Sequence, residues 1–234
     1  MNIFLKVLIC AAIGYCIGTI NPSFLIAKIK GFDIRKRGSG NAGASNALIV
    51  FGKAVGIFCA LFDIYKACLA IEITRRIIFP DFSLAFIITG TAAIVGHMFP
   101  FYMKLKGGKG LACLGGVVLM YDWKFFLILL AIEIIIVLAT DYICFVPMTA
   151  SIIFPITYGI LEDTFLGAAI FLIATVLILF KHAENIMRIR NKTELHFSYL
   201  WNKEKEKQRM NENGVNLDIS QDNVEEKAEE PASK

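Results

Sequence analysis

The sequence lacks any cysteine pattern typical of a disulfide framework or a metal site. Its six cysteines all lie in apolar stretches, and none belongs to a CxxC pair or to a cluster with histidine. We therefore expect them to be small apolar packing residues, and we expect neither a metal ion nor another cofactor.

Charge is also sparse, because charged residues make up 19% of the chain and the formal net charge is only +4. Such a mild and scattered positive charge does not indicate a nucleic-acid-binding protein.

The amino-terminal region lacks the features of a cleaved signal peptide. Residues 1–29 have no basic segment ahead of their apolar run and no convincing small-residue cleavage site. We therefore expect this run to be retained as a first membrane span.

Long apolar runs dominate the rest of the chain. Hydrophobic residues make up 56% of the 234 residues, and about 20 consecutive apolar residues cross a membrane as a helix. The pattern predicts an all-α integral membrane protein with about seven transmembrane helices, in a range of five to seven because two runs are short. The runs are residues 3–29, 47–71, 82–102, 111–121, 125–138, 142–161 and 165–180.

Lysine and arginine in the connecting loops predict the orientation of the chain. They are concentrated in the first loop, the third loop and the segment after the last run, and basic loops are typically cytoplasmic. The amino terminus is then outside and the carboxyl terminus cytoplasmic. We divide the chain into a membrane domain, residues 1–200, and a charged tail, residues 201–234, whose composition predicts a disordered cytoplasmic segment.

The first of three polar segments, residues 37–46, is rich in glycine, hydroxyl and amide side chains. Glycines permit tight turns that expose successive N–H groups, and the following helix amino terminus favours an anion. A plain glycine turn with ordinary helix caps fits the pattern equally well. As an anion site it would use Gly38, Ser39, Gly40, Asn41, Gly43, Ser45 and Asn46.

The second polar segment combines glycine with lysine. Residues 96–100 are Gly-His-Met-Phe-Pro, and residues 104–110 are Lys-Leu-Lys-Gly-Gly-Lys-Gly. Lysines that fix the membrane orientation are one interpretation, but orientation alone requires no glycine. A phosphate site is the other, although the nucleotide-binding pattern GxxxxGK[ST] is absent. Its candidate residues are His97, Lys104, Lys106, Gly107, Gly108, Lys109 and Gly110.

The third polar segment follows the last apolar run. On a helix, His182 and Asn185 share one face that Arg188 continues, whereas Glu184 lies off that face. A solvated helix end explains this segment if it is taken alone. Loop parity, however, predicts that all three segments lie on one side of the membrane. A joint site there suits two phosphates, or one phosphate and a developing oxyanion.

Asp63, Lys66 and Glu133 lie well inside apolar runs. Asp63 and Lys66 are spaced i,i+3, which predicts a structural ion pair. Glu133 has no local partner in the sequence, so a functional carboxyl group and a structural hydrogen bond are equally good interpretations.

Taken together, the polar segments resemble those of the bacterial PlsY family, the acyl-phosphate:glycerol-3-phosphate acyltransferases. The matching stretches are residues 38–46, 96–100, 106–110 and 182–186, with Thr193 and Glu194 after them, and the earlier residues 18–23 and 33–35 fit as well. The resemblance implies a seven-helix enzyme of the bacterial inner membrane, with its site at the cytoplasmic face. It implies transfer of a fatty acyl group from acyl phosphate to the 1-hydroxyl of glycerol 3-phosphate, giving lysophosphatidic acid and phosphate.

The resemblance also implies partners and roles for individual residues. The partners are the two substrates, membrane lipid and, functionally, an enzyme that produces acyl phosphate. Ser39 and its loop would bind one phosphate, and Lys109 with its glycines the other. His182 and Asn185 would contact the acceptor or orient its hydroxyl, and Glu184 would help to bind substrate. We expect direct attack by the acceptor hydroxyl, with either His182 or a substrate phosphate oxygen as the base.

Three positions depart from the family pattern. Ile49 stands where the family commonly has an arginine that binds phosphate, Ala183 replaces a usual arginine, and Lys192 a usual glycine. A divergent relative, non-catalytic or with another acceptor, is therefore one alternative. A multi-span transporter of a phosphorylated metabolite is the second alternative.

Overall fold

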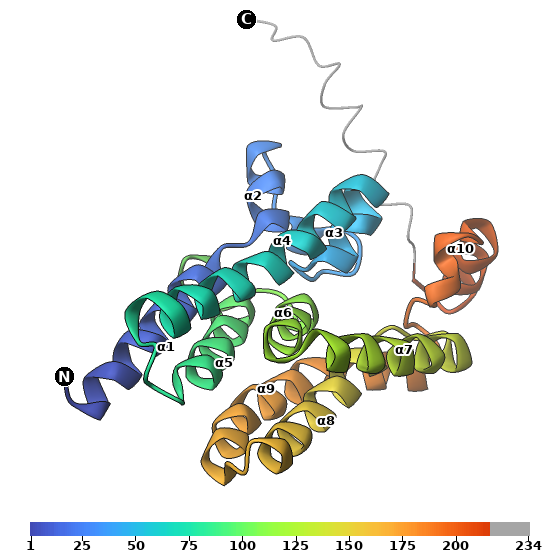
Figure 1. Ribbon diagram of the computed structural model, residues 1–234. Helices are drawn as coiled ribbons and strands as arrows, with labels where there is room; N and C mark the ends of the chain where they lie inside the picture. Colours follow the sequence, from blue (N-terminus) through green and yellow to red (C-terminus); the bar gives the residue numbers. More distant parts are fainter. Residues whose placement is uncertain (216–234) are drawn as a thin grey trace, which may run out of the picture.

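The structure, a computed structural model, describes residues 1–215 and contains helices and loops without a β-strand in that part of the chain (Figure 1). The all-α fold expected from the sequence is confirmed. The α-helices are α1 (Ile3–Thr19), α2 (Pro22–Ile29), α3 (Ala44–Phe51), α4 (Lys53–Glu72), α5 (Ala85–Met98), α6 (Leu111–Tyr121), α7 (Trp123–Thr140), α8 (Phe145–Leu161), α9 (Phe165–Arg190) and α10 (Lys203–Glu212). Short 3-10 or π turns, η1 to η4, occupy Ile34–Lys36, Ile73–Ile78, Phe101–Met103 and Phe197–Leu200.

All seven apolar runs form helices, but the helices differ in length. Within residues 1–215, four helical segments are long and apolar enough to cross a membrane, and the bent pair of α1 and α2 adds a fifth. The apolar helices α6 and α8 are shorter. With 11 residues, α6 covers about 16 Å, roughly half of a hydrocarbon core. The count of five to seven spans and the orientation of the termini therefore stay predictions.

Two of the expected runs are interrupted. The first bends by 40° between α1 and α2. Pro22 starts α2, and the Asn21 side chain caps it by accepting a hydrogen bond from the Phe24 amide at 2.9 Å. The second run is divided at Gly52, whose φ of 89° lies in the left-handed region that glycine tolerates. The sequence-based ranges missed both interruptions because hydrophobicity continues across them.

Close packing of α1 against α5 fixes the end of α5, which carries the second polar segment. A Cβ atom at Gly18 would lie 2.2 Å from the Ala93 carbonyl oxygen, and one at Gly96 would lie 2.3 Å from the Tyr15 carbonyl oxygen. Small residues at such crossings let membrane helices approach closely. The Tyr15 hydroxyl also donates a hydrogen bond to the Phe99 carbonyl at 2.9 Å.

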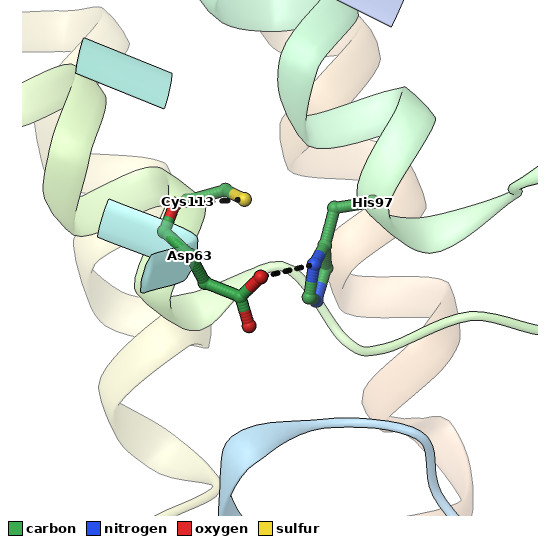
Figure 2. A group of neighbouring side chains, drawn as sticks. All are labelled: Asp63, His97 and Cys113. Atoms are coloured by element: carbon green, nitrogen blue, oxygen red, sulfur yellow. Dashed lines mark hydrogen bonds and ion pairs between the residues drawn. The ribbon is translucent and has the colours of Figure 1, made fainter. Parts of the chain in front are cut away.

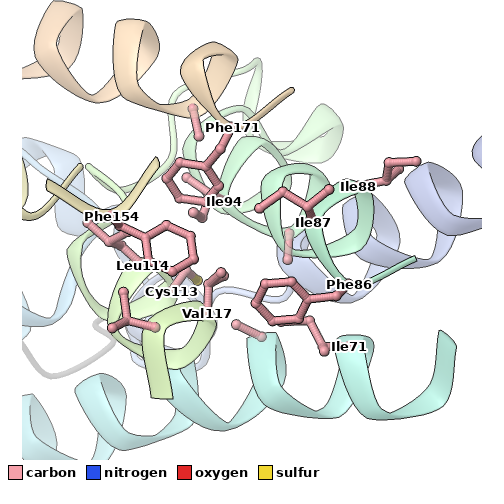
Figure 3. Packing of buried hydrophobic residues seen from close by; sticks show 14 of the residues in the cluster. Ile71, Phe86, Ile87, Ile88, Ile94, Cys113, Leu114, Val117, Phe154 and Phe171 are labelled. Atoms are coloured by element: carbon pink, nitrogen blue, oxygen red, sulfur yellow. The ribbon is translucent and has the colours of Figure 1, made fainter. Parts of the chain in front are cut away.

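Two apolar cores support the molecule. The larger core lies between α1 and α4 to α9 (Figure 3), and its centre includes the edge-to-face pair Phe154 and Phe171, with ring centroids 4.7 Å apart. The smaller core joins α2, η1, α3, α4 and η3 beneath the first polar segment. Its buried residues are Phe24, Ala27, Ile34, Ala42, Ala47, Cys59 and Met103. This smaller core holds the first polar segment next to the second.

The cysteines are all free, and four of the six are buried, as expected for packing residues; Cys16 is exposed.

The first part of the tail differs from the expectation of disorder, because Lys203–Glu212 forms α10 with Glu206 and Met210 buried. Glu206 pairs with Arg209 and His196, and such pairs support a helix that apolar content alone does not indicate. The rest of the predicted tail, residues 216–234, lies outside the described residues.

Candidate active site

A cleft of about 790 Å³ lies where the three polar segments meet. Six basic side chains and two acidic ones line it. Such an excess of positive charge attracts phosphate groups. The charged lining residues are Arg35, Lys104, Lys106, Lys109, Lys181, Arg188, Asp33 and Glu184.

The cleft brings together about half of the site residues predicted from the sequence. Those that line it are Ser39, Gly40, Asn41, Lys104, Lys106, Gly107, Lys109 and Glu184. The others are not part of its lining: Gly38, Gly43, Ser45, Asn46, His97, Gly108, Gly110, His182 and Asn185. Several of this second group hold the lining residues in place.

Asn46 organises the first polar segment from within. Its side chain is fully buried, and its Oδ1 accepts a hydrogen bond from the Ser39 amide at 2.8 Å. Its Nδ2 lies within hydrogen-bond distance of the carbonyl oxygens of Ile34, Arg37 and Asn41. Asn46 therefore shapes the loop that presents Ser39 to the cleft, rather than lining the cleft itself.

Two residues important for this geometry are absent from the predicted site. Asn21, also fully buried, donates a hydrogen bond to the Ala42 carbonyl at 2.9 Å. Arg35, just before the first segment, donates to the Met103 carbonyl at 2.7 Å and to the Lys106 carbonyl of the second segment at 3.3 Å. Arg35 also binds Asp33 through two nitrogens, and this hydrogen bonding lowers the pKa of the Asp33 carboxyl. In the sequence, the feature that pointed to this role of Arg35 was its spacing of two residues from Asp33, close to the glycine loop.

A chain of polar side chains joins the second segment to the third. The Lys109 ammonium donates a hydrogen bond to Asn185 Oδ1, and Asn185 Nδ2 donates to Glu194 Oε1. Glu194 Oε2 accepts a further hydrogen bond from Arg188 Nε at 2.8 Å. The pKa of Lys109 is lowered to about 8, chiefly by desolvation and then by Arg188, while Glu194 and Glu184 act in the opposite direction. Lys109 is thus a cation held at a fixed point on the cleft wall.

His182 lies behind the cleft on α9. It is 3% exposed, and its Nδ1 lies 2.8 Å from the Ile178 carbonyl oxygen. A carbonyl oxygen only accepts hydrogen bonds, so Nδ1 carries the proton and Nε2 keeps its lone pair. The ring is therefore held in one tautomer on the α9 face that also carries Asn185.

Asp63, His97 and Cys113 form a buried group of the kind that can hold a metal ion (Figure 2). However, the Lys66 ammonium lies 2.6 Å from Asp63 Oδ1 and 3.1 Å from His97 Nδ1, and it donates to the Ile20 carbonyl at 2.5 Å. The acid and the ring thus already have a cationic partner, and the ion pair predicted from the i,i+3 spacing is present. We interpret the group as a charge network that joins α1, α4 and α5.

This network supports the lysine-glycine loop through His97. The Gly108 amide donates to the His97 carbonyl at 3.1 Å, and the Gly107 amide donates to the Met98 carbonyl at 3.0 Å. A Cβ atom at Gly108 would lie 2.1 Å from His97 Nε2. The two glycines are therefore required for the close packing of the loop on His97, whether or not they also approach a phosphate.

The structure shows the surroundings of Glu133 and Ile49, two residues whose roles the sequence left open. Glu133 of α7 accepts hydrogen bonds from the Thr149 hydroxyl of α8 at 2.7 and 2.8 Å, which fits the interpretation of this carboxyl group as a structural hydrogen-bonding partner. Ile49 lines a smaller neighbouring cavity of about 200 Å³ with Tyr199 and Lys203, and it is not part of the cleft lining.

Comparison with known proteins identifies relatives of the whole helical region. A sequence model of the family described as glycerol-3-phosphate acyltransferase matches residues 8–192. Glycerol-3-phosphate acyltransferase 2 of Thermotoga maritima is 39% identical over 183 residues, covering 78% of this chain and 92% of the relative. The glycerol-3-phosphate acyltransferase of Lactiplantibacillus plantarum is 36% identical over 207 residues, covering 86% of this chain and 97% of the relative.

The fold also matches solved structures. The crystal structure of PlsY, an integral membrane glycerol 3-phosphate acyltransferase, in its glycerol 3-phosphate form has a TM-score of 0.75 and 30% sequence identity, covering 83% of this chain and 96% of that one. Its lysophosphatidic acid form has a TM-score of 0.71. With these matches over most of both chains, the protein belongs to the PlsY family of integral membrane glycerol-3-phosphate acyltransferases.

Proposed function

We propose that this acyltransferase moves a fatty acyl group from acyl phosphate to the 1-hydroxyl of glycerol 3-phosphate, giving lysophosphatidic acid and inorganic phosphate. The observation that carries the proposal is the excess of basic side chains around one cleft. Both substrates present a phosphate, so a cleft that must hold both needs cations on more than one wall. Here the cations come from η1, from the loop before α6 and from the end of α9.

The proposed phosphate sites lie on different walls of the cleft. Ser39 and the backbone of its loop bind one phosphate, with Arg35 nearby. Lys109 and Gly107 bind the other, with Arg188 nearby. Lys109 is suited to charge that develops on the leaving phosphate, because its hydrogen bond to Asn185 fixes the ammonium before reaction.

The acyl chain has an apolar route to the cleft. Phe180 and Met187 of α9 belong to the cleft lining, and they are 72% and 60% exposed. On the outer face of a membrane helix, such side chains contact lipid. We propose that the donor enters from the bilayer past these two residues, with its phosphate directed toward the basic walls.

The proposed reaction is a direct displacement. The 1-hydroxyl oxygen bonds to the acyl carbon, and the bond from that carbon to the phosphate oxygen breaks with its electron pair passing to phosphate. A substrate phosphate oxygen takes the hydroxyl proton. His182 is the less accessible base, because it is 3% exposed and is not part of the cleft lining. In this mechanism positioning and charge stabilisation supply most of the rate.

We propose that the reaction occurs at the cytoplasmic face of the bacterial inner membrane, and that a separate enzyme supplies the acyl phosphate. The basic loops that carry the cleft support this orientation. No soluble acyl carrier is then required at this step, because the activated donor already resides in the bilayer.

A comparison of donors tests the proposal. Purified protein in lipid is given acyl phosphate, acyl-CoA or acyl carrier protein, with glycerol 3-phosphate or glycerol as the acceptor. We expect lysophosphatidic acid only from acyl phosphate with glycerol 3-phosphate. Equal product from acyl-CoA would contradict the proposed donor, and acylation of glycerol at a similar rate would contradict the proposed acceptor.

A further inference from the structure

The carboxyl-terminal helix α10 is connected to the candidate site although it lies beyond the residues that match the family. The match ends at residue 192, and α10 begins at Lys203. Its contacts converge on the turn that follows α9, residues 191–196, which we call the Glu194 turn.

Arg209 of α10 binds the backbone of this turn. Its Nη1 donates to the Lys192 carbonyl at 2.7 Å, and its Nη2 donates to the Glu194 carbonyl at 2.6 Å. Lys192 has a φ of 60°, in the left-handed region where a side chain is strained. Hydrogen bonds from a guanidinium to carbonyls on both sides of residue 193 therefore stabilise a backbone conformation that the chain does not favour by itself.

Glu206 completes the attachment from the same helix. It is 4% exposed and forms an ion pair with Arg209. It also accepts a hydrogen bond from the His196 amide at 2.8 Å and lies 3.1 Å from His196 Nδ1. The Arg209 and Glu206 pair thus holds the backbone before, at and after Glu194.

The Glu194 side chain transmits this placement to the cleft. One carboxylate oxygen accepts a hydrogen bond from Asn185 and the other from Arg188. The Asn185 oxygen in turn accepts the hydrogen bond from Lys109. A shift of the Glu194 backbone would therefore alter the orientation of the Asn185 amide and the position of the Lys109 ammonium.

We propose that α10 is an integral clamp of the active site, in which Arg209 and Glu206 are positioning residues that hold Glu194 so that Asn185 can fix Lys109. They are not part of the cleft lining and act only through the turn. The proposal rests on the proposed function in one respect, namely that Lys109 takes part in acyl transfer. The clamp is distinct from a second contact beyond the turn, where the Asp141 backbone carbonyl accepts a hydrogen bond from the Phe197 amide at 2.7 Å.

The kinetic test compares Arg209→Ala, Arg209→Lys and the matched control Lys205→Ala, an exposed cation on the same helix, in full-length protein in lipid. We expect Arg209→Ala to lower kcat by about ten- to a hundredfold, with a smaller effect on KM, since displacement of a positioned group by about 1 Å has effects of this size. Arg209→Lys should recover part of the loss, and Lys205→Ala should match the wild type. A kcat for Arg209→Ala equal to that of the control overturns the proposal.

The pH profile separates positioning from a general loss of folded protein. The charged or titratable groups near Lys109 are Arg188, Glu184, Glu194 and Cys144. The Glu194 carboxylate favours the ammonium form of Lys109, so its displacement lets the amine lose its proton at lower pH. In Arg209→Ala, the alkaline limb of kcat/KM should therefore move to lower pH, whereas an unchanged limb argues against the clamp.

Hydrogen exchange decides the question without an activity assay. In Arg209→Ala, backbone amides of residues 188–196 should exchange about tenfold faster or more than in Lys205→Ala. Equal exchange in the two variants overturns the proposal, whether or not the wild type is active. Inactivity of the wild type with acyl phosphate would instead count only against the proposed function. If Arg209→Ala does not fold, Glu206→Gln replaces it, because glutamine keeps an acceptor for His196 but loses the ion pair.

Discussion

The Lys109 ammonium donates a hydrogen bond to the side-chain oxygen of Asn185, 76 positions later in the chain. This contact joins the lysine-glycine loop to the polar end of α9, and it fixes a cation on the wall of the basic cleft. Because Asn185 is itself held by Glu194, the ammonium has little freedom to follow a moving substrate. A preformed cation of this kind stabilises charge in a transition state better than a mobile surface lysine.

The first prediction concerns pH. With a pKa of about 8 for Lys109, the ammonium is present below that pH and is lost as the pH rises through it. We therefore expect kcat/KM to fall on the alkaline side with a midpoint near pH 8. Lys109→Arg should be slower but should lose this limb, since a guanidinium stays protonated. An unchanged limb in Lys109→Arg would assign it to another group.

The second prediction concerns the base. If a substrate phosphate oxygen takes the proton, His182→Gln should lower kcat by less than about 100-fold, because general base catalysis by a side chain contributes about 10²–10⁴-fold. Glutamine can still donate toward the Ile178 carbonyl that His182 Nδ1 contacts. Steady-state rates at saturating substrate provide the measurement. A loss of 10³-fold or more, with binding intact, would make His182 the base.

The third prediction concerns Ile49. Since its side chain lines the neighbouring cavity with Lys53 and Lys203 and not the cleft, Ile49→Arg should leave the KM for glycerol 3-phosphate within about threefold of the wild type. A free energy of about 1.4 kcal/mol corresponds to a tenfold change. A tenfold fall in KM would show instead that position 49 reaches the acceptor phosphate, as the family pattern implies.

The fourth prediction concerns the glycine loop. Gly108→Ala places a Cβ 2.1 Å from the His97 ring, and overpacking of this kind costs about 1–3 kcal/mol. We expect a lower thermal unfolding midpoint in detergent together with a loss of activity. Gly115→Ala in α6 is the matched control, because its Cβ would meet no atom closer than 3.8 Å. Similar midpoints for the two variants would contradict the packing argument.

The sequence predicted the elements of the site better than their internal geometry. Hydrophobic runs and loop charges indicated that three polar segments share one side, and the cleft that contains Ser39, Lys109 and Glu184 agrees with this. The i,i+3 spacing of Asp63 and Lys66 likewise predicted their ion pair. Such inferences succeed because they depend on local spacing and on the cost of charge in lipid.

Hydrogen bonds to distant backbone groups escaped prediction. Asn46 looked like a ligand residue, but its polar atoms bind the loop itself, and Asn21 holds the same loop from α2. No residue pattern reveals which carbonyl a buried amide will meet after folding. Helix α10 was missed for a related reason: besides the burial of Met210, it is stabilised by Arg209 and Glu206, which pair with each other and with the Glu194 turn.

The most direct test of the account is the stoichiometry of the reaction in lipid. Purified protein receives acyl phosphate and glycerol 3-phosphate, and both lysophosphatidic acid and inorganic phosphate are measured over time beside a Lys109→Ala variant. We predict equal molar amounts of the two products from the wild type and a greatly reduced rate from the variant. Phosphate release without lysophosphatidic acid, or an unaffected Lys109→Ala variant, would contradict the account.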